Sequence, residues 1–184
     1  MDDGAGADIG HHGMVLRRDD AGAGMSESHV LEVLTAFGEA GCRFWVAGGW
    51  GVDALIGHQT RPHQDLDLAI DAQDEPAALD VLNGLGYRVE TDWRPVRVEL
   101  ARPDHARVDL HPVHFDKGGH GRQADLDGGH FDYPPEAFAT GLLGGVVTPC
   151  LSRAQQVRFH RGYEPRPRDL HDLAILESLA LTPP

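Results

Sequence analysis

The strongest constraint on the fold of this 184-residue chain is a short alternating stretch, residues 66–70, which predicts a β-strand. Successive side chains of a strand point to opposite faces. One face therefore carries Leu66, Leu68 and Ile70, and the other carries Asp65, Asp67 and Ala69. The first face can be buried in a core, while the second presents two neighbouring carboxylates. Because Asp is disfavoured in strands, the pair favours a functional role over the alternative of a solvated strand edge.

Upstream of this strand, the chain turns on two glycines. Gly48-Gly49 follows an apolar run and precedes a short helix that is expected to begin near Trp50. A glycine turn at a helix start can bring backbone N–H groups close to a phosphate, although a lone Gly-Gly pair is more often only a turn. Arg61 and His63, in the loop that follows, could contact phosphate oxygens or could be solvated surface residues.

Asp109 is the natural third member of the acidic group. It stands in the middle of another alternating strand, with His111 on its own face. If this strand lies beside the strand that carries Asp65 and Asp67, three carboxylates converge. Adjacent carboxylates repel unless a cation lies between them, and Mg²⁺ is the expected ion because it takes oxygen ligands and bridges to phosphates. Such a group can also accept a proton from an attacking hydroxyl.

Three further side chains near these positions have two interpretations each. His111 belongs either to the site or to an ordinary strand end, since Pro112 follows it. Arg97 and Glu99 project from alternate positions of a third strand. They either line the acidic face or pair with each other on a solvated surface.

Charge and composition limit the classes of partner. The formal net charge of −13 disfavours nucleic acid, because phosphate binding needs a basic face. It suits a small cationic substrate, although acidity can also serve solubility alone. We see no apolar run long enough to span a bilayer and no export signal, so we expect a cytoplasmic protein with no membrane partner. Cys42 and Cys150 are then expected to be reduced.

The expected fold class is α+β, a mixed β-sheet flanked by helices, with further helices at the C-terminus. We expect residues 1–24 to form a flexible extension, residues 25–150 the core, and residues 151–184 a C-terminal helical segment. The C-terminal helices are the expected surface of a possible homodimer.

Individual elements follow from caps, breakers and periodicity. Residues 116–130 are polar and glycine-rich and predict a loop. Ser152 and Gln155 match a capping box, which predicts a helix that runs to about Tyr163. The other predicted elements are a helix capped by Ser26 or Ser28 and ending near Gly41, a helix from Pro76 to Gly86, strands at 44–46, 96–100, 108–111 and 146–148, and a last helix from about Asp169.

The ordered motifs resemble a known superfamily. Gly-Gly-Trp-x-x-Asp, then Arg-x-His-x-Asp-Leu-Asp, then Asp109 on a later strand, are similar to the DNA polymerase β-like nucleotidyltransferases. The likeness runs from about Met25 to Leu179 and is strongest to the small lincosamide nucleotidyltransferases, which inactivate lincomycin and clindamycin. It includes the segments Trp93-Arg94-Pro95-Val96-Arg97-Val98-Glu99-Leu100, Val108-Asp109-Leu110-His111-Pro112, Gln123-Ala124-Asp125, Gly128-Gly129, Pro149-Cys150-Leu151-Ser152 and Phe159-His160-x-Gly-Tyr163.

The resemblance implies a polymerase-β-like nucleotidyltransferase fold and a role for each matching residue. Gly48, Gly49 and Trp50 would hold the nucleotide phosphates, with Arg61 and His63 near the triphosphate. Asp65 and Asp67 would bind Mg²⁺, and Asp109 would be the third carboxylate and the general base. The residues expected to bind the acceptor substrate are Trp93, Arg97, Glu99, His111, His160 and Tyr163. The segment with His160, Tyr163, Asp169 and Asp172 would close over nucleotide or acceptor.

The implied reaction is Mg²⁺-dependent transfer of a nucleoside monophosphate, expected to be AMP from ATP, to a hydroxyl of a lincosamide antibiotic. One alternative is the same transfer to an aminoglycoside, whose several amines would need several carboxylates, or to another acceptor. A second alternative is an inactive nucleotide-binding or toxin–antitoxin module. The intact acidic trio argues against the second alternative.

Overall fold

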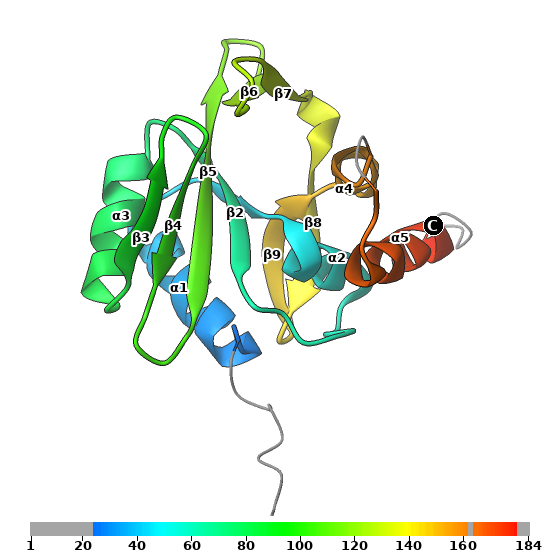
Figure 1. The fold of residues 1–184 in the computed structure, drawn as a ribbon, viewed down its shortest axis with the longest axis horizontal. Coiled ribbons are helices and arrows are strands. Elements are labelled where there is room, and N and C mark those ends of the chain that lie inside the picture. The colour runs from blue at the N-terminus through cyan, green and yellow to red at the C-terminus, as the bar shows by residue number, and fades with distance from the viewer. Residues whose placement is uncertain (1–23, 162–163, 180–184) are drawn as a thin grey trace, which may run out of the picture.

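The computed structural model describes residues 24–161 and 164–179 (Figure 1). The expected flexible extension therefore falls almost wholly outside the described residues, and Tyr163 does as well. Figure 1 shows α1 and α3 beside each other against the sheet, whereas α4 and α5 gather around α2. The architecture is α+β, as the sequence predicts.

The first helix, α1 (Glu27–Glu39), forms where the caps and the apolar period predict it. The Ser26 side chain accepts a hydrogen bond from the His29 backbone N–H at the helix start. The apolar stripe of the helix is buried against the sheet. Past the helix end, Gly41 has a φ of +71°, which glycine adopts without strain.

The sheet is mixed, and its strand order is β3-β4-β5-β2-β1-β9-β8. The β2–β5 and β1–β9 pairs are parallel, whereas the other neighbours in this order are antiparallel. The strands are β1 (Phe44–Val46), β2 (Leu66–Asp71), β3 (Arg88–Trp93), β4 (Arg97–Ala101), β5 (Arg107–Phe115), β8 (Phe138–Leu143) and β9 (Val146–Leu151).

The two faces of β2 follow the predicted alternation. Leu66, Leu68 and Ile70 are fully buried in the larger core cluster, together with residues of α1, α3 and β5. Ala69 faces the other way and packs in a second cluster with Tyr133. Burial of β2 on its apolar face thus leaves Asp67 on the opposite face of the sheet.

The predicted loop at residues 116–130 is wrong in part. It contains β6 (Gly121–Ala124), which pairs with the end of β5 and with β7 (His130–Tyr133). The glycines occupy the tight turns on either side of β6: Gly119 and Gly128 have φ values of +80° and +82°. Turn glycines therefore mark a pair of hairpin turns here, and the hairpin stands above the main sheet (Figure 1).

The remaining helices are α2 (Gly48–Ile56), α3 (Glu75–Gly84), α4 (Arg153–Phe159) and α5 (Pro167–Leu179), with a short 3₁₀ turn at Pro135–Ala137. Helix α4 stops at Phe159, short of the predicted end. Only half of its capping box forms, because Ser152 accepts from the Gln155 N–H while the Gln155 side chain donates to the Asp132 carbonyl at 2.9 Å. No helix among the described residues is long and apolar enough to cross a membrane.

Candidate active site

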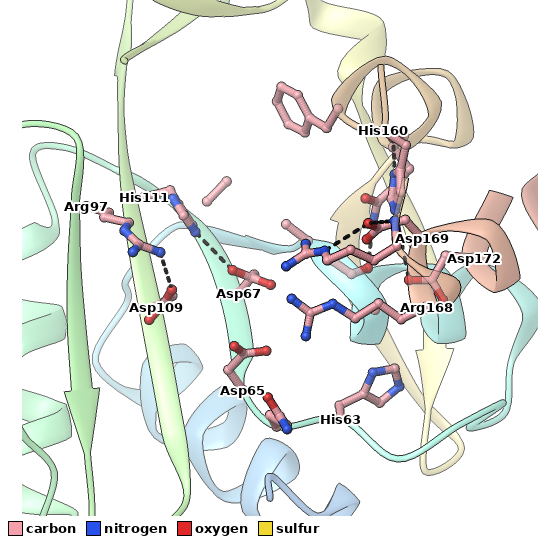
Figure 2. A pocket seen from close by; sticks show the side chains of 18 of the residues that line it. His63, Asp65, Asp67, Arg97, Asp109, His111, His160, Arg168, Asp169 and Asp172 are labelled. Carbon is pink, nitrogen blue, oxygen red and sulfur yellow. Dashed lines mark hydrogen bonds and ion pairs between the residues drawn. The ribbon is translucent and has the colours of Figure 1, made fainter. Parts of the chain in front are cut away.

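A cavity of about 680 Å³ opens between the β2–β5 pair and the α4–α5 segment (Figure 2). Acidic side chains from the strands line one side, and basic and aromatic side chains from the C-terminal part line the other. The predicted site residues that line it are Gly48, Gly49, Arg61, His63, Asp65, Asp67, Arg97, Asp109, His111 and His160. The cavity therefore brings together most of the residues that sequence patterns single out.

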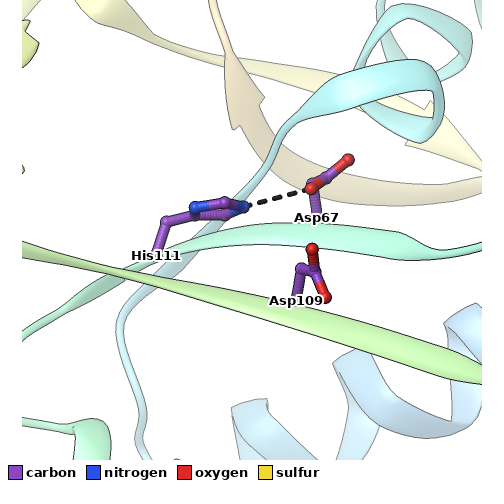
Figure 3. Close-up of side chains that lie close together, drawn as sticks. All are labelled: Asp67, Asp109 and His111. Carbon is purple, nitrogen blue, oxygen red and sulfur yellow. Dashed lines mark hydrogen bonds and ion pairs between the residues drawn. The ribbon is translucent and has the colours of Figure 1, made fainter. Parts of the chain in front are cut away.

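The acidic centre lies on two adjacent strands. Asp67 and Asp109 are register partners in the parallel β2–β5 pair, as the predicted strand adjacency requires. Together with His111, each offers an atom within 4.8 Å of the others (Figure 3). Asp65 precedes β2 and lines the same cavity, but the close cluster is Asp67, Asp109 and His111. The three predicted carboxylates thus line one cavity. His111, which the sequence placed either at the site or at an ordinary strand end, lies beside Asp67 and Asp109.

Negative charge is crowded at this centre. Burial raises the pKa of Asp109 to about 7, helped by the charges of Asp67 and Glu99. Burial, and then the Asp67 charge, also raise the pKa of Asp65. Burial opposes ionisation of Asp67 too, but a hydrogen bond from His111 and nearby arginines outweigh it and lower its pKa. A divalent cation would relieve this crowding, and oxygen atoms are the ligands that Mg²⁺ prefers.

Arg97 combines the two interpretations that its sequence position leaves open. Its Nη1 lies 3.1 Å from Asp109 Oδ2, while its Nη2 lies 2.5 Å from Glu99 Oε1. Its guanidinium also stacks on the Trp93 ring, 4.6 Å from the ring centroid. Trp93 and Glu99 are not among the residues that line the cavity, and both contact Arg97. Their contact with substrate stays a prediction, while the contacts that the structure shows support Arg97.

The two glycines form the first turn of α2 instead of a turn before it. Gly48 has a φ of +55°, and a Cβ at this position would lie 2.2 Å from Asp67 Oδ2. A Cβ at Gly49 would lie 2.3 Å from His63 Nδ1 and 2.6 Å from Arg61 Nη2. Both positions therefore require glycine, because charged and polar side chains approach the backbone directly.

The Trp50 side chain does not line the cavity, so only its backbone, in the first turn of α2, can take the predicted place at the phosphates. Its side chain is 1% exposed and packs in the main core. Its ring lies 4.6 Å from the His63 ring, measured between centroids. His63 in turn is hydrogen-bonded through Nε2 to the buried Asp53 carboxylate of α2. Trp50 thus supports His63 from behind.

The loop before β2 is tied to the C-terminal helix by a buried ion pair. Arg61 donates from Nε and Nη2 to the two oxygens of Asp172, at 2.9 and 2.6 Å. Burial alone would raise the pKa of Asp172, but the hydrogen bonds from Arg61 and the nearby His160 ring outweigh it and lower the pKa to about 2. The same carboxylate, 3.9 Å from His160 Nε2, raises the pKa of His160. These residues join the two sides of the cavity.

Several cavity residues carry no predicted role. Arg168 extends from α5 toward Asp65 and Asp67 (Figure 2), and its charge favours the ionised form of both carboxyl groups, although burial outweighs it at Asp65 and the pKa there is raised. Phe131 and Tyr133 of β7 form an aromatic wall with Phe159 of α4, with ring centroids 5.7 and 5.3 Å from Phe159. In the sequence, Arg168 directly follows Pro167 and precedes the predicted last helix, and nothing there signals a role at the site; the wall depends on the unpredicted hairpin.

A glycine-opened helix faces paired carboxylates on neighbouring strands of a mixed sheet, an arrangement that fits a nucleotidyltransferase site. The family model Aminoglycoside-2''-adenylyltransferase matches residues 29–176. The chain is 32% identical to a lincosamide resistance protein of Staphylococcus haemolyticus over 155 residues, which cover 84% of this chain and 96% of that protein. The chain belongs to this family of adenylyltransferases and is an enzyme of the nucleotidyltransferase class.

Solved structures agree with this assignment. The crystal structure of the lincosamide antibiotic adenylyltransferase LnuA, lincomycin-bound, matches with a TM-score of 0.78 at 32% identity, covering 85% of this chain and 99% of that chain. ANT(2'')-Ia in complex with adenylyl-2''-tobramycin has a TM-score of 0.68 at 17% identity, covering 84% and 88%, and shares the fold. A 2''-aminoglycoside nucleotidyltransferase of Escherichia coli is 34% identical over 60 residues, which cover 33% of this chain and 34% of that protein.

Proposed function

We propose that the protein is a Mg²⁺-dependent enzyme that transfers AMP from ATP to a hydroxyl of a lincosamide antibiotic and so inactivates it. The observation that carries the proposal is the likeness to a lincosamide resistance protein along 84% of the chain. The likeness to the aminoglycoside enzyme of Escherichia coli covers only 33%. We therefore assign a lincosamide as the acceptor, after the relative that matches the longer part of the chain.

The residues present fit a divalent metal ion. Asp67 and Asp109 supply oxygen ligands on paired strand positions, and Asp65 lines the same cavity. Burial, and then the charge of Asp67, raise the pKa of Asp109 and Asp65, and a bound cation would favour their ionised forms. When bound, Mg²⁺ would neutralise phosphate charge and hold the attacking and leaving oxygens in line.

The nucleotide phosphates are assigned to the basic side of the cavity. The N-terminus of α2 has no side-chain cap, so its first N–H groups can donate to phosphate oxygens beside Gly48 and Gly49. Arg61 and Arg168 line the cavity there and add positive charge. The Arg61–Asp172 pair fixes the direction of the Arg61 guanidinium, which lowers the entropy lost on binding.

The chemical step needs a proton acceptor near the acceptor hydroxyl. The hydroxyl oxygen attacks the α-phosphorus, the bond to the β-phosphate bridging oxygen breaks, and pyrophosphate leaves. Asp109 takes the hydroxyl proton, and Arg97 holds its carboxylate from the side of Oδ2. Positioning and charge stabilisation supply most of the acceleration in such phosphoryl transfers.

The acceptor side of the cavity favours a partly apolar substrate. Phe131, Tyr133 and Phe159 present aromatic surface there. The two carboxylates that α5 adds to the cavity, Asp169 and Asp172, are already paired with Arg166 and Arg61. A polyamine such as an aminoglycoside would need several unpaired carboxylates, whereas a monobasic lincosamide needs fewer and gains from aromatic contact.

An acceptor panel tests the proposal. The purified full chain is incubated with ATP, Mg²⁺ and lincomycin, clindamycin or tobramycin, and adducts are detected by mass spectrometry. We expect an adenylyl adduct on the lincosamides and none without Mg²⁺. An adduct on tobramycin alone would assign the aminoglycoside alternative, which the matched family model favours by its name. No adduct on any acceptor would favour the inactive nucleotide-binding module.

Two features of organisation belong to the same proposal. We assign the cytoplasm as the compartment, since ATP is available there, and residues 151–184 as the segment that closes the cavity over its ligands. The described part of that segment supplies His160, Arg168 and Asp172 to the site. A homodimer through the C-terminal helices stays a prediction, which light scattering on the purified full chain would test.

A further inference from the structure

A chain of hydrogen bonds connects the β6–β7 hairpin to Asp67. The Tyr133 hydroxyl donates to Gln123 Oε1 at 2.5 Å, and Gln123 Nε2 lies 3.2 Å from His111 Nδ1. On the other side of the imidazole, His111 Nε2 lies 3.1 Å from Asp67 Oδ1. Gln123 and Tyr133 are 6% and 2% exposed, so the amide is held by protein groups. This chain runs from the aromatic wall to the acidic centre.

The backbone carbonyl of Val96 fixes the direction of these hydrogen bonds. Gln123 Nε2 lies 3.4 Å from the Val96 oxygen, which can only accept, so the facing amide atom is the nitrogen. The same NH₂ group donates to His111 Nδ1, which must then be an acceptor. His111 therefore carries its proton on Nε2 and donates it to Asp67 Oδ1.

A ring nitrogen that carries a proton is not a metal ligand. His111 would otherwise be a natural ligand, because its ring nitrogen and the oxygens of Asp67 and Asp109 lie within 4.8 Å of one another (Figure 3). The hydrogen bond from His111 also occupies Oδ1 of Asp67. The other oxygen, Oδ2, faces the start of α2 beside Gly48. The hydrogen bond thus fixes the direction in which the two oxygens of Asp67 point.

We propose that Gln123 is a positioning residue of the transfer reaction, which acts through His111 to orient the Asp67 carboxylate and keeps His111 a hydrogen-bond donor instead of a metal ligand. The inference rests on the proposed function, because Asp67 is taken there as a metal ligand. The β6–β7 hairpin then has two tasks, since it carries the aromatic wall and also supports the metal side.

The tautomer of His111 tests, directly and without metal, whether Gln123 keeps His111 a hydrogen-bond donor. The full chain is labelled with ¹⁵N-histidine, and the ring nitrogens are observed by NMR in the presence of EDTA. His111→Gln identifies the signals. We expect one tautomer with the proton on Nε2 in the wild type and a mixture in Gln123→Met, which keeps the length of the side chain but cannot donate. A proton on Nδ1 in the wild type, or an unchanged pattern in the variant, would overturn the proposal.

Binding of Mn²⁺, followed by electron paramagnetic resonance, tests whether Gln123 acts through His111 to orient the Asp67 carboxylate. Gln123→Met should weaken Mn²⁺ binding about 10-fold, the usual effect of losing a group that supports a metal ligand. The loss should vanish in a His111→Gln background, since a glutamine amide donates to Asp67 unaided. Gln155→Met is the matched control, because Gln155 is buried and donates to the Asp132 carbonyl of the same hairpin without reaching His111.

The outcomes separate a positioning role from general damage. Equal weakening by Gln155→Met, or a Gln123→Met effect that persists in the His111→Gln background, would contradict the proposal. If the wild type bound no Mn²⁺, the metal role of Asp67 and the proposed function would fail. The ¹⁵N pattern of the metal-free chain would still decide whether Gln123 sets the His111 tautomer.

Discussion

Asp67 and Asp109 are directly paired across the parallel strands β2 and β5, which forces two carboxylates into one small volume. The predicted metal site depends on this register, because a shift by one residue would turn either side chain to the other face of the sheet. The pairing also has a cost for the metal-free protein. Burial and the charge of Asp67 raise the pKa of Asp109 to about 7.

The first prediction follows from that raised pKa. The folded protein holds the Asp109 proton more tightly than the unfolded chain, whose carboxyl groups titrate near 4. Ionisation therefore destabilises the fold as pH rises from about 4 to above 7. Asp109→Asn should make the metal-free protein more stable at pH 8, by on the order of 1 kcal/mol or ~2–4 °C in Tm. Urea and thermal unfolding of the wild type and the variant in EDTA, at pH 4 and pH 8, measure this difference. A variant that is no more stable than the wild type at pH 8 would contradict the prediction.

Gly48 offers a second prediction. An alanine there would place Cβ 2.2 Å from Asp67 Oδ2 and would strain a backbone with a φ of +55°. We expect Gly48→Ala to cost about 1–2 kcal/mol in stability and to lower nucleotidyl transfer at least ~10-fold, because Asp67 must move. Gly57→Ala at the other end of α2 is the control, since φ is +88° but the nearest atom is 4.0 Å away. Its backbone cost should be similar while transfer is retained; equal activity losses would contradict the Asp67 explanation.

The Arg61–Asp172 pair should matter for docking of α5. Asp172→Asn leaves the guanidinium of Arg61 without its carboxylate in a mostly buried place, which should cost about 2–4 kcal/mol in unfolding free energy. The exposed Asp92–Arg94 pair is about as short, and Asp92→Asn should cost far less, because solvent screens an exposed pair. Denaturant unfolding of both variants at pH 7 gives the comparison. Equal costs would show that burial does not strengthen the Arg61 pair.

His160 gives a further pH-dependent prediction, with the same sign as that of Asp109, because its pKa is also raised in the folded protein. The Asp172 carboxylate, 3.9 Å from His160 Nε2, raises the pKa of His160, so the stabilisation is fully present below the unfolded pKa and is lost as pH rises through the folded one. The stability lost in His160→Gln should therefore be larger at pH 5.5 than at pH 9. Urea midpoints at the two pH values measure it. A loss independent of pH would assign His160 a packing role only.

Sequence patterns predicted the acidic centre because strand alternation is a local rule. The period of two in β2 and β5 gives the faces of Asp67 and Asp109, and the fold confirms that the strands are neighbours. The same rule missed β3, whose side chains are nearly all exposed, so that no apolar alternation marks it. It missed β7 for the same reason, because of its four residues only Tyr133 is buried.

Local sequence patterns could not predict the residues on the other side of the cavity, because their positions depend on contacts between distant segments. Arg168 reaches the carboxylates only because α5 packs against α2, a contact between segments more than 100 residues apart. Trp50 follows the two glycines in sequence, but its large side chain is most stable in the core, behind His63. The role of Gln123 depends on a carbonyl oxygen from Val96, in a different turn of the sheet.

The most direct test of the central claim is single-turnover transfer of AMP from ATP to lincomycin in Mg²⁺, measured by mass spectrometry for the wild type, Asp67→Asn and Asp109→Asn. The account predicts an adduct with the wild type and a loss of at least ~100-fold in both variants, with Asp109→Asn slowing the chemical step much more than it weakens ATP binding. Near-normal transfer by folded Asp67→Asn, or by folded Asp109→Asn, would contradict the assignment of these paired carboxylates as the catalytic centre.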